Sequence, residues 1–373
     1  MYSSFIVRLY PNRVQEDFFI RQFGCCRYVY NAFLTEKKLE YDLFGRYLSY
    51  NNCSAMLTEH KKHNPWLRDT DSQALVQSLR NLETAFKRFF KGISDYPQYK
   101  SKYNPVQSYK TMNINNCIRI RCNRIRLPKV GWIKFRTKQK IKGTIKSVTV
   151  KKNPSGKYTV SILCSDVPQK PFKPNNRSCG LDLGIKNFVT INTGETIPFP
   201  EQKKINKLNN KLKREQRKLS KKKKGSNKYK KQKKKIAQIH EKIHNTLKYH
   251  FHKISQRIVE KYQIISMETL NIKGMLKNSK LSAKISEKAW HMFKEILTQK
   301  AQKHGRTIIT INPWYPSSKI CHNCQHKNTE LKLNMRTWTC PKCKKKHDRD
   351  INASINIQKQ GLKEYHKKIK KIN

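Results

Sequence analysis

The sequence predicts a multidomain α/β protein in which helical and β-rich segments precede an α/β domain that carries a cysteine motif near its end. Three observations support this class. Apolar residues recur at helical spacing between residues 11 and 92, and two-residue alternation replaces this pattern between 96 and 167. Beyond residue 176, apolar strands alternate with helical stretches, and two Cys-x-x-Cys pairs interrupt this alternation after residue 316.

The charge of the chain predicts a polyanionic partner. Its 373 residues are enough for two or three domains with buried cores, although only 36% of them are hydrophobic. The formal charge of +58 and the pI of about 10.2 exceed what solubility requires, and so much like charge repels itself unless a polyanion neutralises it. Nucleic acid is therefore the expected partner.

The sequence does not predict a membrane protein. An anionic membrane surface would also attract this charge, but no apolar run approaches the roughly 20 residues that span a bilayer. Met1 to Tyr10 lacks the apolar stretch of a secretory signal. We expect a cytoplasmic, nucleoid-associated protein, and the abundance of lysine, asparagine and isoleucine fits an AT-rich bacterial genome.

The N-terminal part predicts one strand followed by a helical lobe at residues 11–92. Phe5 to Leu9 alternates as a strand does, and Gln15 to Tyr41 has helical periodicity. A second helix is expected between a cap at Ser72 and a stop at Gly92. Its apolar residues recur at spacings of four and three: Leu75, Leu79, Leu82, Phe86 and Phe89.

The next segment, residues 93–175, predicts a small β-barrel or sandwich that the N-terminal strand 1–10 could complete. Short alternating runs are separated by turn signals such as Pro128 and Gly131: Ile118 to Ile125, Trp132 to Phe135, Ser147 to Val150 and Tyr158 to Leu163. Basic residues lie between five aromatic ones: Tyr99, Tyr103, Tyr109, Trp132 and Phe135. These rings either stack on bases beside phosphate-binding cations or form core under a solvated basic face.

A lysine-rich stretch from Lys203 to Tyr249 predicts a helical hairpin that breaks at Gly225. Like charges four residues apart repel each other in a helix, so we expect a phosphate backbone as the counterion. The alternative is a disordered basic segment. An apolar stripe that disorder would not need favours the hairpin: Leu208, Leu212, Leu219, Ile236, Ile239 and Ile243.

Three acidic residues stand at the ends of predicted elements. Asp182 belongs to the strand CGLDLGIKNFVTI, where Gly180 and Gly184 share its face and would let a phosphodiester approach closely. Glu268 ends an apolar strand within QIISMETLNIKGM, and carboxyl ends of strands are where α/β sheets place ligands. Asp350, within HDRDINASINI, starts a predicted helix, where a simple cap is the alternative role.

Taken together, the three acids predict a hydrolase. The chain has only 24 acidic residues, and these three lie in otherwise apolar or glycine-rich settings. Two divalent cations roughly 3.5 to 4 Å apart need such carboxylates to stabilise the attacking and leaving oxygens of a phosphodiester. Magnesium or manganese is the expected catalytic metal.

The four clustered cysteines predict a zinc ribbon. Cys321, Cys324, Cys340 and Cys343 form a CxxC-x15-CxxC pattern, and four thiolates close a tetrahedron, so the zinc should be structural. His322, His326 and His347 could substitute as ligands, although surface or supporting positions suit them better. The other seven cysteines predict no disulfide framework and are expected to be core or surface residues: Cys25, Cys26, Cys53, Cys117, Cys122, Cys164 and Cys179.

Several of these motifs together resemble the TnpB (OrfB-type) proteins of insertion sequences, which are RNA-guided nucleases related to the type V CRISPR effectors. GLDLGIKNFVT, METLNIKGM, WYPSSKIC, the CxxC pair and DRDINASINI follow that family's RuvC-like blocks in order. FIVRLYPNRVQ, CCRYVYNAFL and LRNLETAFKRFFKG resemble its N-terminal segments, and RIRLPKVGWIKFR its β-barrel segment. The resemblance covers nearly the whole chain, with NASIN in place of the commoner NAA form.

The resemblance implies an RNase H-like (RuvC-like) nuclease domain at 176–315, including the basic hairpin 203–249, with a zinc ribbon at 316–346 and a RuvC-like C-terminal segment at 347–373. It implies a β-barrel (WED-like) domain and a helical (REC-like) lobe that hold a transposon-derived guide RNA. Asp182, Glu268 and Asp350 match the family's catalytic acids, and Asp348 fits less well. The implied activity is cleavage of double-stranded target DNA beside a short target-adjacent motif.

Two other activities fit parts of the sequence. A strand-transfer transposase also uses an RNase H-like acidic triad, but the inserted ribbon and the N-terminal blocks favour the guided nuclease. A guide-directed DNA-binding repressor would have lost its catalytic acids, and all three are intact here. The guide sequence and the target-adjacent motif are not encoded in the chain, because base pairing carries that recognition.

Overall fold

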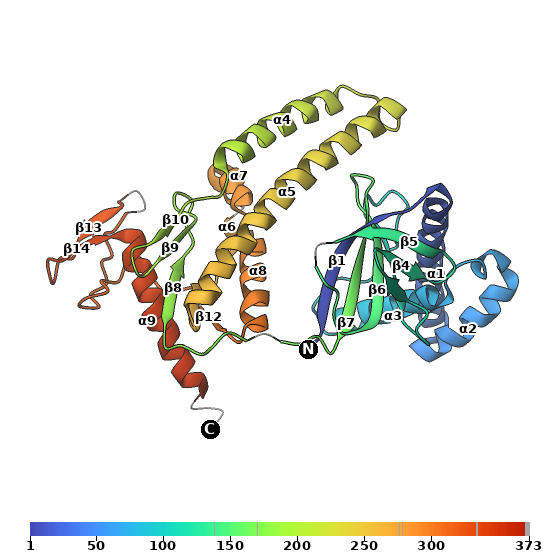
Figure 1. Ribbon diagram of the computed structural model, residues 1–373, viewed down its shortest axis with the longest axis horizontal. Helices are drawn as coiled ribbons and strands as arrows, with labels where there is room; N and C mark the ends of the chain where they lie inside the picture. The colour runs from blue at the N-terminus through green and yellow to red at the C-terminus, as the bar shows by residue number, and fades with distance from the viewer. Residues whose placement is uncertain (138, 170, 276, 278, 333–334, 370–373) are drawn as a thin grey trace. The chain divides into compact units, whose positions relative to one another are not determined.

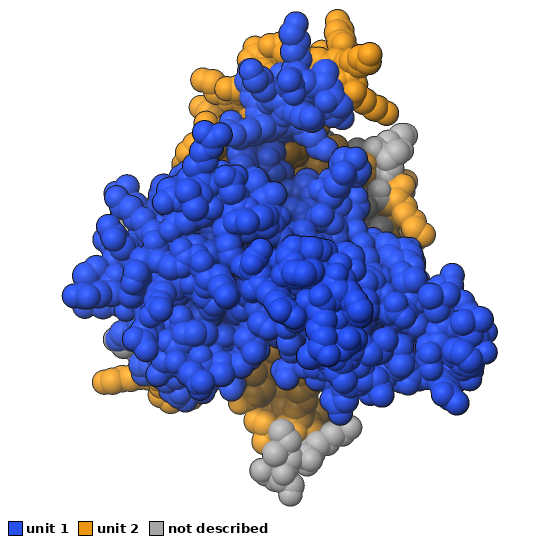
Figure 2. All heavy atoms as spheres, turned by 90° about the vertical axis from the view of Figure 1, so that its right-hand side faces the viewer, with its two compact units in different colours: residues 1–168, 225–238 blue, residues 169–224, 239–373 orange. Residues whose placement is uncertain are grey.

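The chain folds into two compact units. In the computed structural model, the described residues are 1–369 except 138, 170, 276, 278 and 333–334, so the end of the predicted C-terminal segment, 370–373, lies outside them. Unit 1 contains residues 1–168 and 225–238, and unit 2 contains 169–224 and 239–373 (Figures 1 and 2). Within the described part of the chain, no helix combines the length and apolarity needed to cross a bilayer.

Unit 1 contains a seven-stranded antiparallel sheet in the order β2-β6-β7-β1-β5-β4-β3. The N-terminal strand β1 pairs with both β5 and β7, which confirms that it joins the β-rich segment. The predicted run from Ile118 to Ile125 is not one strand, because a turn with left-handed Cys122 (φ 51°) divides it. The strands are β1 Ser3–Tyr10, β2 Gln107–Met112, β3 Arg119–Arg121, β4 Arg124–Leu127, β5 Gly131–Arg136, β6 Thr144–Lys152 and β7 Tyr158–Ser165.

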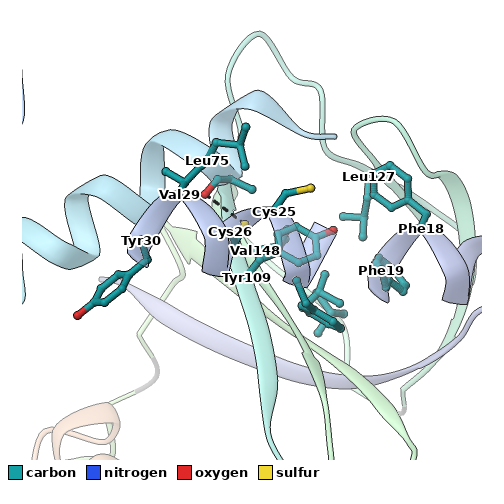
Figure 3. Close-up of a cluster of buried hydrophobic side chains, with 14 of the residues drawn as sticks. Phe18, Phe19, Cys25, Cys26, Val29, Tyr30, Leu75, Tyr109, Leu127 and Val148 are labelled. Atoms are coloured by element: carbon teal, nitrogen blue, oxygen red, sulfur yellow. Dashed lines mark hydrogen bonds between the residues drawn. The ribbon is translucent and has the colours of Figure 1, made fainter. Parts of the chain in front are cut away.

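The predicted helical lobe consists of α1 Arg13–Phe44, α2 Tyr50–His63, a short 3-10 turn Pro65–Leu67 and α3 Ser72–Phe90. The expected cap at Ser72 is wrong: Asp71 is the cap, and its carboxylate accepts a hydrogen bond from the backbone of Gln73 (3.0 Å). Aromatic residues of α1 pack on the sheet, with the rings of Phe19 and Tyr109 6.2 Å apart (Figure 3). This packing makes one hydrophobic core from the helices and the sheet.

Unit 2 is built on a mixed five-stranded sheet in the order β10-β9-β8-β11-β12. β8, β11 and β12 run parallel, whereas β9 and β10 continue antiparallel from β8. Stacked and edge-on aromatic rings of Phe188, Phe251 and Phe293 fill its core. The strands are β8 Ser178–Asp182, β9 Val189–Ile191, β10 Thr196–Ile197, β11 Ile264–Glu268 and β12 Thr307–Ile311.

The remaining elements include the predicted hairpin, whose two arms are α4 Gln202–Ser220 and α5 Asn227–Lys261 (Figure 1). Its helices exclude the disordered alternative, because Ile205, Ile236 and Ile239 are buried. Unit 2 also contains α6 Ile272–Met275, α7 Ser279–Lys288, α8 Trp290–Lys303, the hairpin β13 Thr337–Thr339 with β14 Lys346–Asp348, and α9 Arg349–Ile369.

Candidate catalytic and metal sites

Two of the three predicted acids end neighbouring parallel strands. Asp182 is the last residue of β8 and Glu268 the last of β11, and the register pairs the preceding residues, Leu181 and Met267. Adjacent strands lie about 4.8 Å apart, so the two carboxyl groups share one edge of the sheet. Both residues are half-buried.

Helix α9 brings the third acid. It begins at Arg349, and the carboxylate of Asp348 accepts hydrogen bonds from the backbone of Asp350 and Ile351 (3.0 Å each). Asp348 therefore caps the helix, and the alternative role of Asp350 as a simple cap is wrong. The Asp350 carboxylate takes no part in this cap and instead acts electrostatically on Asp182.

A close approach between backbones positions α9 over the sheet. A Cβ on Gly180 would lie 2.0 Å from the carbonyl oxygen of Ser354, and a Cβ on Gly361 would lie 2.0 Å from the hydroxyl of Ser266. Only glycine fits at such distances. Gly180 therefore admits the helix that carries Asp350, and the expectation that it admits a phosphodiester is wrong.

The electrostatics of the three acids favour a bound cation. Burial raises the pKa of Asp182 well above its usual range, and the neighbouring Glu268 and Asp350 carboxyls raise it further. Burial also raises the pKa of Glu268, although the Ser317 hydroxyl opposes this by donating a hydrogen bond to Oε1. Carboxylates this close cannot all ionise without a compensating charge, which a divalent cation would supply.

Sequence reasoning missed two side chains that contact these acids. Nη1 of Arg336 lies 3.1 and 3.3 Å from the two carboxylate oxygens of Asp350, whose side chain is only 15% exposed. Ser317 lies in the WYPSSKIC block and contacts Glu268. The one available signal was that Arg336 is the only arginine between the two CxxC pairs.

The four clustered thiols have the geometry of a tetrahedral metal site. Their sulfur atoms all lie within 4.8 Å of one another, and the pairs Cys321–Cys343 and Cys324–Cys340 are each 3.6 Å apart. Four sulfurs 2.3 Å from one zinc ion would lie about 3.8 Å apart, so the residues fit this metal. A backbone hydrogen bond from Lys345 lowers the pKa of Cys343 to about 6, which favours the thiolate that zinc requires.

His347 lies beside the thiols. Its Nε2 is 3.1 Å from the sulfur of Cys321, and its side chain is buried against Trp338. His347 therefore contacts the thiol cluster from a buried position. This agrees with the sequence-based preference for a supporting role over a role as a metal ligand.

Two asparagines of the DRDINASINI segment connect the thiol cluster to α9. The Asn352 carbonyl accepts a hydrogen bond from the backbone of His322 (2.9 Å), and its amide donates to the carbonyl of Ile320 (2.7 Å). The Asn356 amide donates to the carbonyl of Ser317 (2.8 Å). Asn352 and Asn356 are both fully buried, so one helix fixes both Asp350 and the cysteine-bearing loop.

Basic surfaces occur on both units. In unit 2, α4 and α5 enclose a groove of about 1030 Å³ lined by cations and amides: Lys203, Lys204, Lys207, Lys211, Arg214, Lys242, Asn206, Asn210 and Asn245. In unit 1, the five aromatic residues that alternate with basic ones divide between the two predicted roles, base stacking and core packing. Tyr109 and Phe135 are core, whereas Tyr99, Tyr103 and Trp132 are exposed.

Comparisons with known proteins match the chain over most of its length. Residues 160–279 match the IS605 OrfB family model described as "Probable transposase", residues 290–357 the Cas12f1-like TNB domain, and residues 1–45 a helix-turn-helix domain of the same OrfB group. The chain is 35% identical to a Streptomyces pristinaespiralis protein named "Putative RNA-guided DNA endonuclease", covering 96% of this chain and 89% of the relative. It is 30% identical to the Escherichia coli K12 "Putative RNA-guided DNA endonuclease InsQ", covering 96% and 92%.

One solved structure shares the fold. The cryo-EM structure of a Cas12f1-sgRNA-target DNA complex matches with a TM-score of 0.60 and 16% sequence identity, over 93% of this chain and 83% of that one. At this identity, the likeness concerns the fold alone.

Proposed function

We propose that this chain, which belongs to the TnpB (OrfB-type) family of insertion-sequence proteins, is an RNA-guided endonuclease that cuts double-stranded DNA next to a short target-adjacent motif. The observation that carries the proposal is the convergence of Asp182, Glu268 and Asp350 at one edge of the unit 2 sheet. The names of the two relatives point to the same activity.

Each unit takes one part of this function in the proposal. The sheet order of unit 2, with helix α9 packed on β8 and β11, supports an RNase H-like (RuvC-like) nuclease domain at 176–315 and 347–373. The ribbon 316–346 would hold structural zinc through its four thiols. Residues 11–92 are the REC-like lobe and 1–10 with 93–175 the WED-like domain, all of them in unit 1 except 169–175, and both hold RNA and DNA through their basic surfaces.

The acids and their neighbours have distinct tasks. Asp182, Glu268 and Asp350 would hold magnesium or manganese, which supplies an activated water and neutralises charge on the leaving oxygen. Ser317 orients Glu268 through its hydroxyl hydrogen bond. Arg336 neutralises Asp350 and presents a guanidinium at the edge of the site, where a phosphate oxygen can accept a hydrogen bond from it.

The description of the matched family model favours one second candidate, a strand-transfer transposase. Such an enzyme joins DNA ends through a similar acidic triad, and it has no need of a guide. The two activities therefore differ in their products and in their dependence on RNA.

The test is to express the protein from its native locus, sequence the RNA that co-purifies, and replace the guide portion of that RNA. We expect one discrete RNA that ends at the element boundary, and double-strand breaks that move to the new target. Joined DNA ends without any guide dependence would establish the transposase instead. Guide-directed binding without breaks would establish a repressor.

A further inference from the structure

One tryptophan lies exposed in the loop that follows β12. Trp314 is 89% exposed, more than any other large apolar side chain in the part of the chain that the structure describes. Its neighbour Tyr315 is half-buried, so the loop covers the phenol and leaves the indole in water. Tryptophan is highly buried on average, and an indole this exposed therefore requires an explanation.

The loop starts and ends beside the proposed catalytic acids. The parallel register pairs Ile311, the last residue of β12, with Glu268, and the Ser317 hydroxyl donates a hydrogen bond to Glu268. Trp314 is three residues from each of these points. Because a chain extends by at most about 3.6 Å per residue, its Cα lies within about 11 Å of the Cα atoms of both Ile311 and Ser317. The indole is thus at the rim of the catalytic edge.

The backbone of this loop is held in place. Pro313 and Pro316 flank the exposed residue and Tyr315, and each fixes its own φ. The side chain of Asn312 accepts a hydrogen bond from the backbone of Trp314 (2.8 Å), and Ser317 at the inner end is buried. The exposure of the indole therefore belongs to an ordered turn and costs little further entropy when a ligand covers the ring.

The surrounding charges favour a nucleic acid as that ligand. Arg349 donates a hydrogen bond to the Ser318 hydroxyl of the same loop (3.4 Å), and the half-exposed Arg336 contacts Asp350. Aromatic rings combined with cations bind single strands, because every base has a face that stacks on a ring. A base inside a duplex has both faces covered, so only an unpaired base can stack on Trp314.

We infer that Trp314 stacks on a base beside the scissile phosphate of a DNA strand that enters the site single-stranded, and that this contact positions the phosphate at the acids. The identity of the strand rests on the proposed function. A ring face offers no hydrogen-bond pattern to read, so all four bases should be accepted, with a modest preference set by stacking strength.

The first test compares Trp314→Ala, Trp314→Leu and Trp314→Phe in single-turnover cleavage by guide-loaded protein in magnesium. Stacking on an aromatic side chain contributes about 5- to 150-fold per base, so the Ala and Leu variants should cut slower by a factor in this range. The Phe variant should retain most of the rate, because it keeps a ring. Affinity for target DNA should not change, since base pairing with the guide carries it.

The second test removes the base instead of the indole. After the cut is mapped with the unmodified protein, an abasic nucleotide is placed at each position on either side of it. At one position, the abasic substrate should slow the unmodified protein as much as Trp314→Ala does, and it should not slow Trp314→Ala further. In EDTA, 2-aminopurine at that position should fluoresce less with the unmodified protein than with Trp314→Ala, because stacking quenches it.

A matched variant in the same loop separates stacking from support of the metal site. Ser317→Ala removes the hydrogen bond to Glu268, so it should raise the magnesium concentration that gives half-maximal cleavage. Trp314→Ala should leave this concentration unchanged. A rise in both variants would show that the tryptophan only shapes the loop, and would overturn the inference.

Two other outcomes would also overturn it. Cleavage by Trp314→Ala at the unmodified rate would exclude a contribution from the ring. Abasic substrates that slow Trp314→Ala and the unmodified protein equally at every position would show that the ring and the base do not meet. Failure of the proposed function looks different, because the unmodified protein itself would then cut no guided target.

Discussion

The sharpest test of the proposed catalytic site is a matched pair of substitutions two residues apart, Asp350→Asn and Asp348→Asn. Both replace a carboxylate by an amide of the same shape. Asp350 faces the other acids, whereas Asp348 caps α9 through two backbone hydrogen bonds that an asparagine oxygen can also accept. The same chemical change should therefore have opposite consequences.

The structure sets the size of each effect. Removing a metal-binding charge should cost about 3 kcal/mol or more of transition-state stabilisation, which corresponds to a rate at least about 100-fold lower. Asp348→Asn should retain most of the activity. Asp348→Ala removes the cap and should cost about 1 kcal/mol of stability, which lowers Tm by about 2 to 4 °C in a unit of this size, with appreciable activity remaining.

The assay is single-turnover cleavage of labelled target DNA in magnesium by guide-loaded protein, with DNA binding and thermal melting measured in parallel. Asp182→Ala and Glu268→Ala should behave as Asp350→Asn does, losing cleavage but not binding, because binding rests on lysines and arginines elsewhere. An inactive Asp348→Asn beside an active Asp350→Asn would show that the third carboxylate is misassigned. Cleavage by all three triad variants would refute the proposed nuclease site.

Three further predictions concern metals and stability. The pKa values of Asp182 and Glu268 are raised in the folded state, so the folded protein binds more protons than the unfolded chain. The stability of the metal-free protein should therefore fall as the pH rises from about 4 through these raised pKa values. Differential scanning fluorimetry in EDTA should therefore show Asp182→Asn melting above the unmodified protein at about pH 7 and losing that advantage near pH 4, and an unchanged or lower melting temperature at pH 7 would contradict the electrostatics. Cys324→Ser should release zinc and lower Tm, and metal analysis that finds no zinc near one equivalent in the unmodified protein would disprove the ribbon. Calcium should support DNA binding better than cleavage and manganese should replace magnesium, so efficient cutting in calcium would count against the proposed magnesium site.

Local patterns in the sequence were sufficient for most elements of the fold. The alternation of β1 and of β5 to β7, the periodicity of α1 and α3, and the break in the basic hairpin all depend on neighbours in the chain, and each prediction is confirmed. The helix-cap prediction failed where two adjacent residues could both serve as the N-cap of α3. Asp71 and not Ser72 caps α3, because its carboxylate reaches the backbone of Gln73.

The candidate site was less predictable where it depends on distant segments. Gly180 was correctly singled out, but its partner is the backbone of α9, which lies more than 170 residues further along the chain. Asp348 and Asp350 look alike in the sequence, and only the hydrogen bonds to Asp348 separate the cap from the acid that faces Asp182.

Short segments of the sequence were enough to identify the family, the three acids at element ends and the thiol spacing, because strand ends, helix starts and CxxC turns are local properties of the chain. Three features became visible only in the folded chain: the contact of Arg336 with Asp350, the contact of Ser317 with Glu268, and the asparagine connection between the thiol cluster and α9. These features join residues far apart in the chain. Their geometry follows from how closely packed backbones approach one another, which no local pattern encodes.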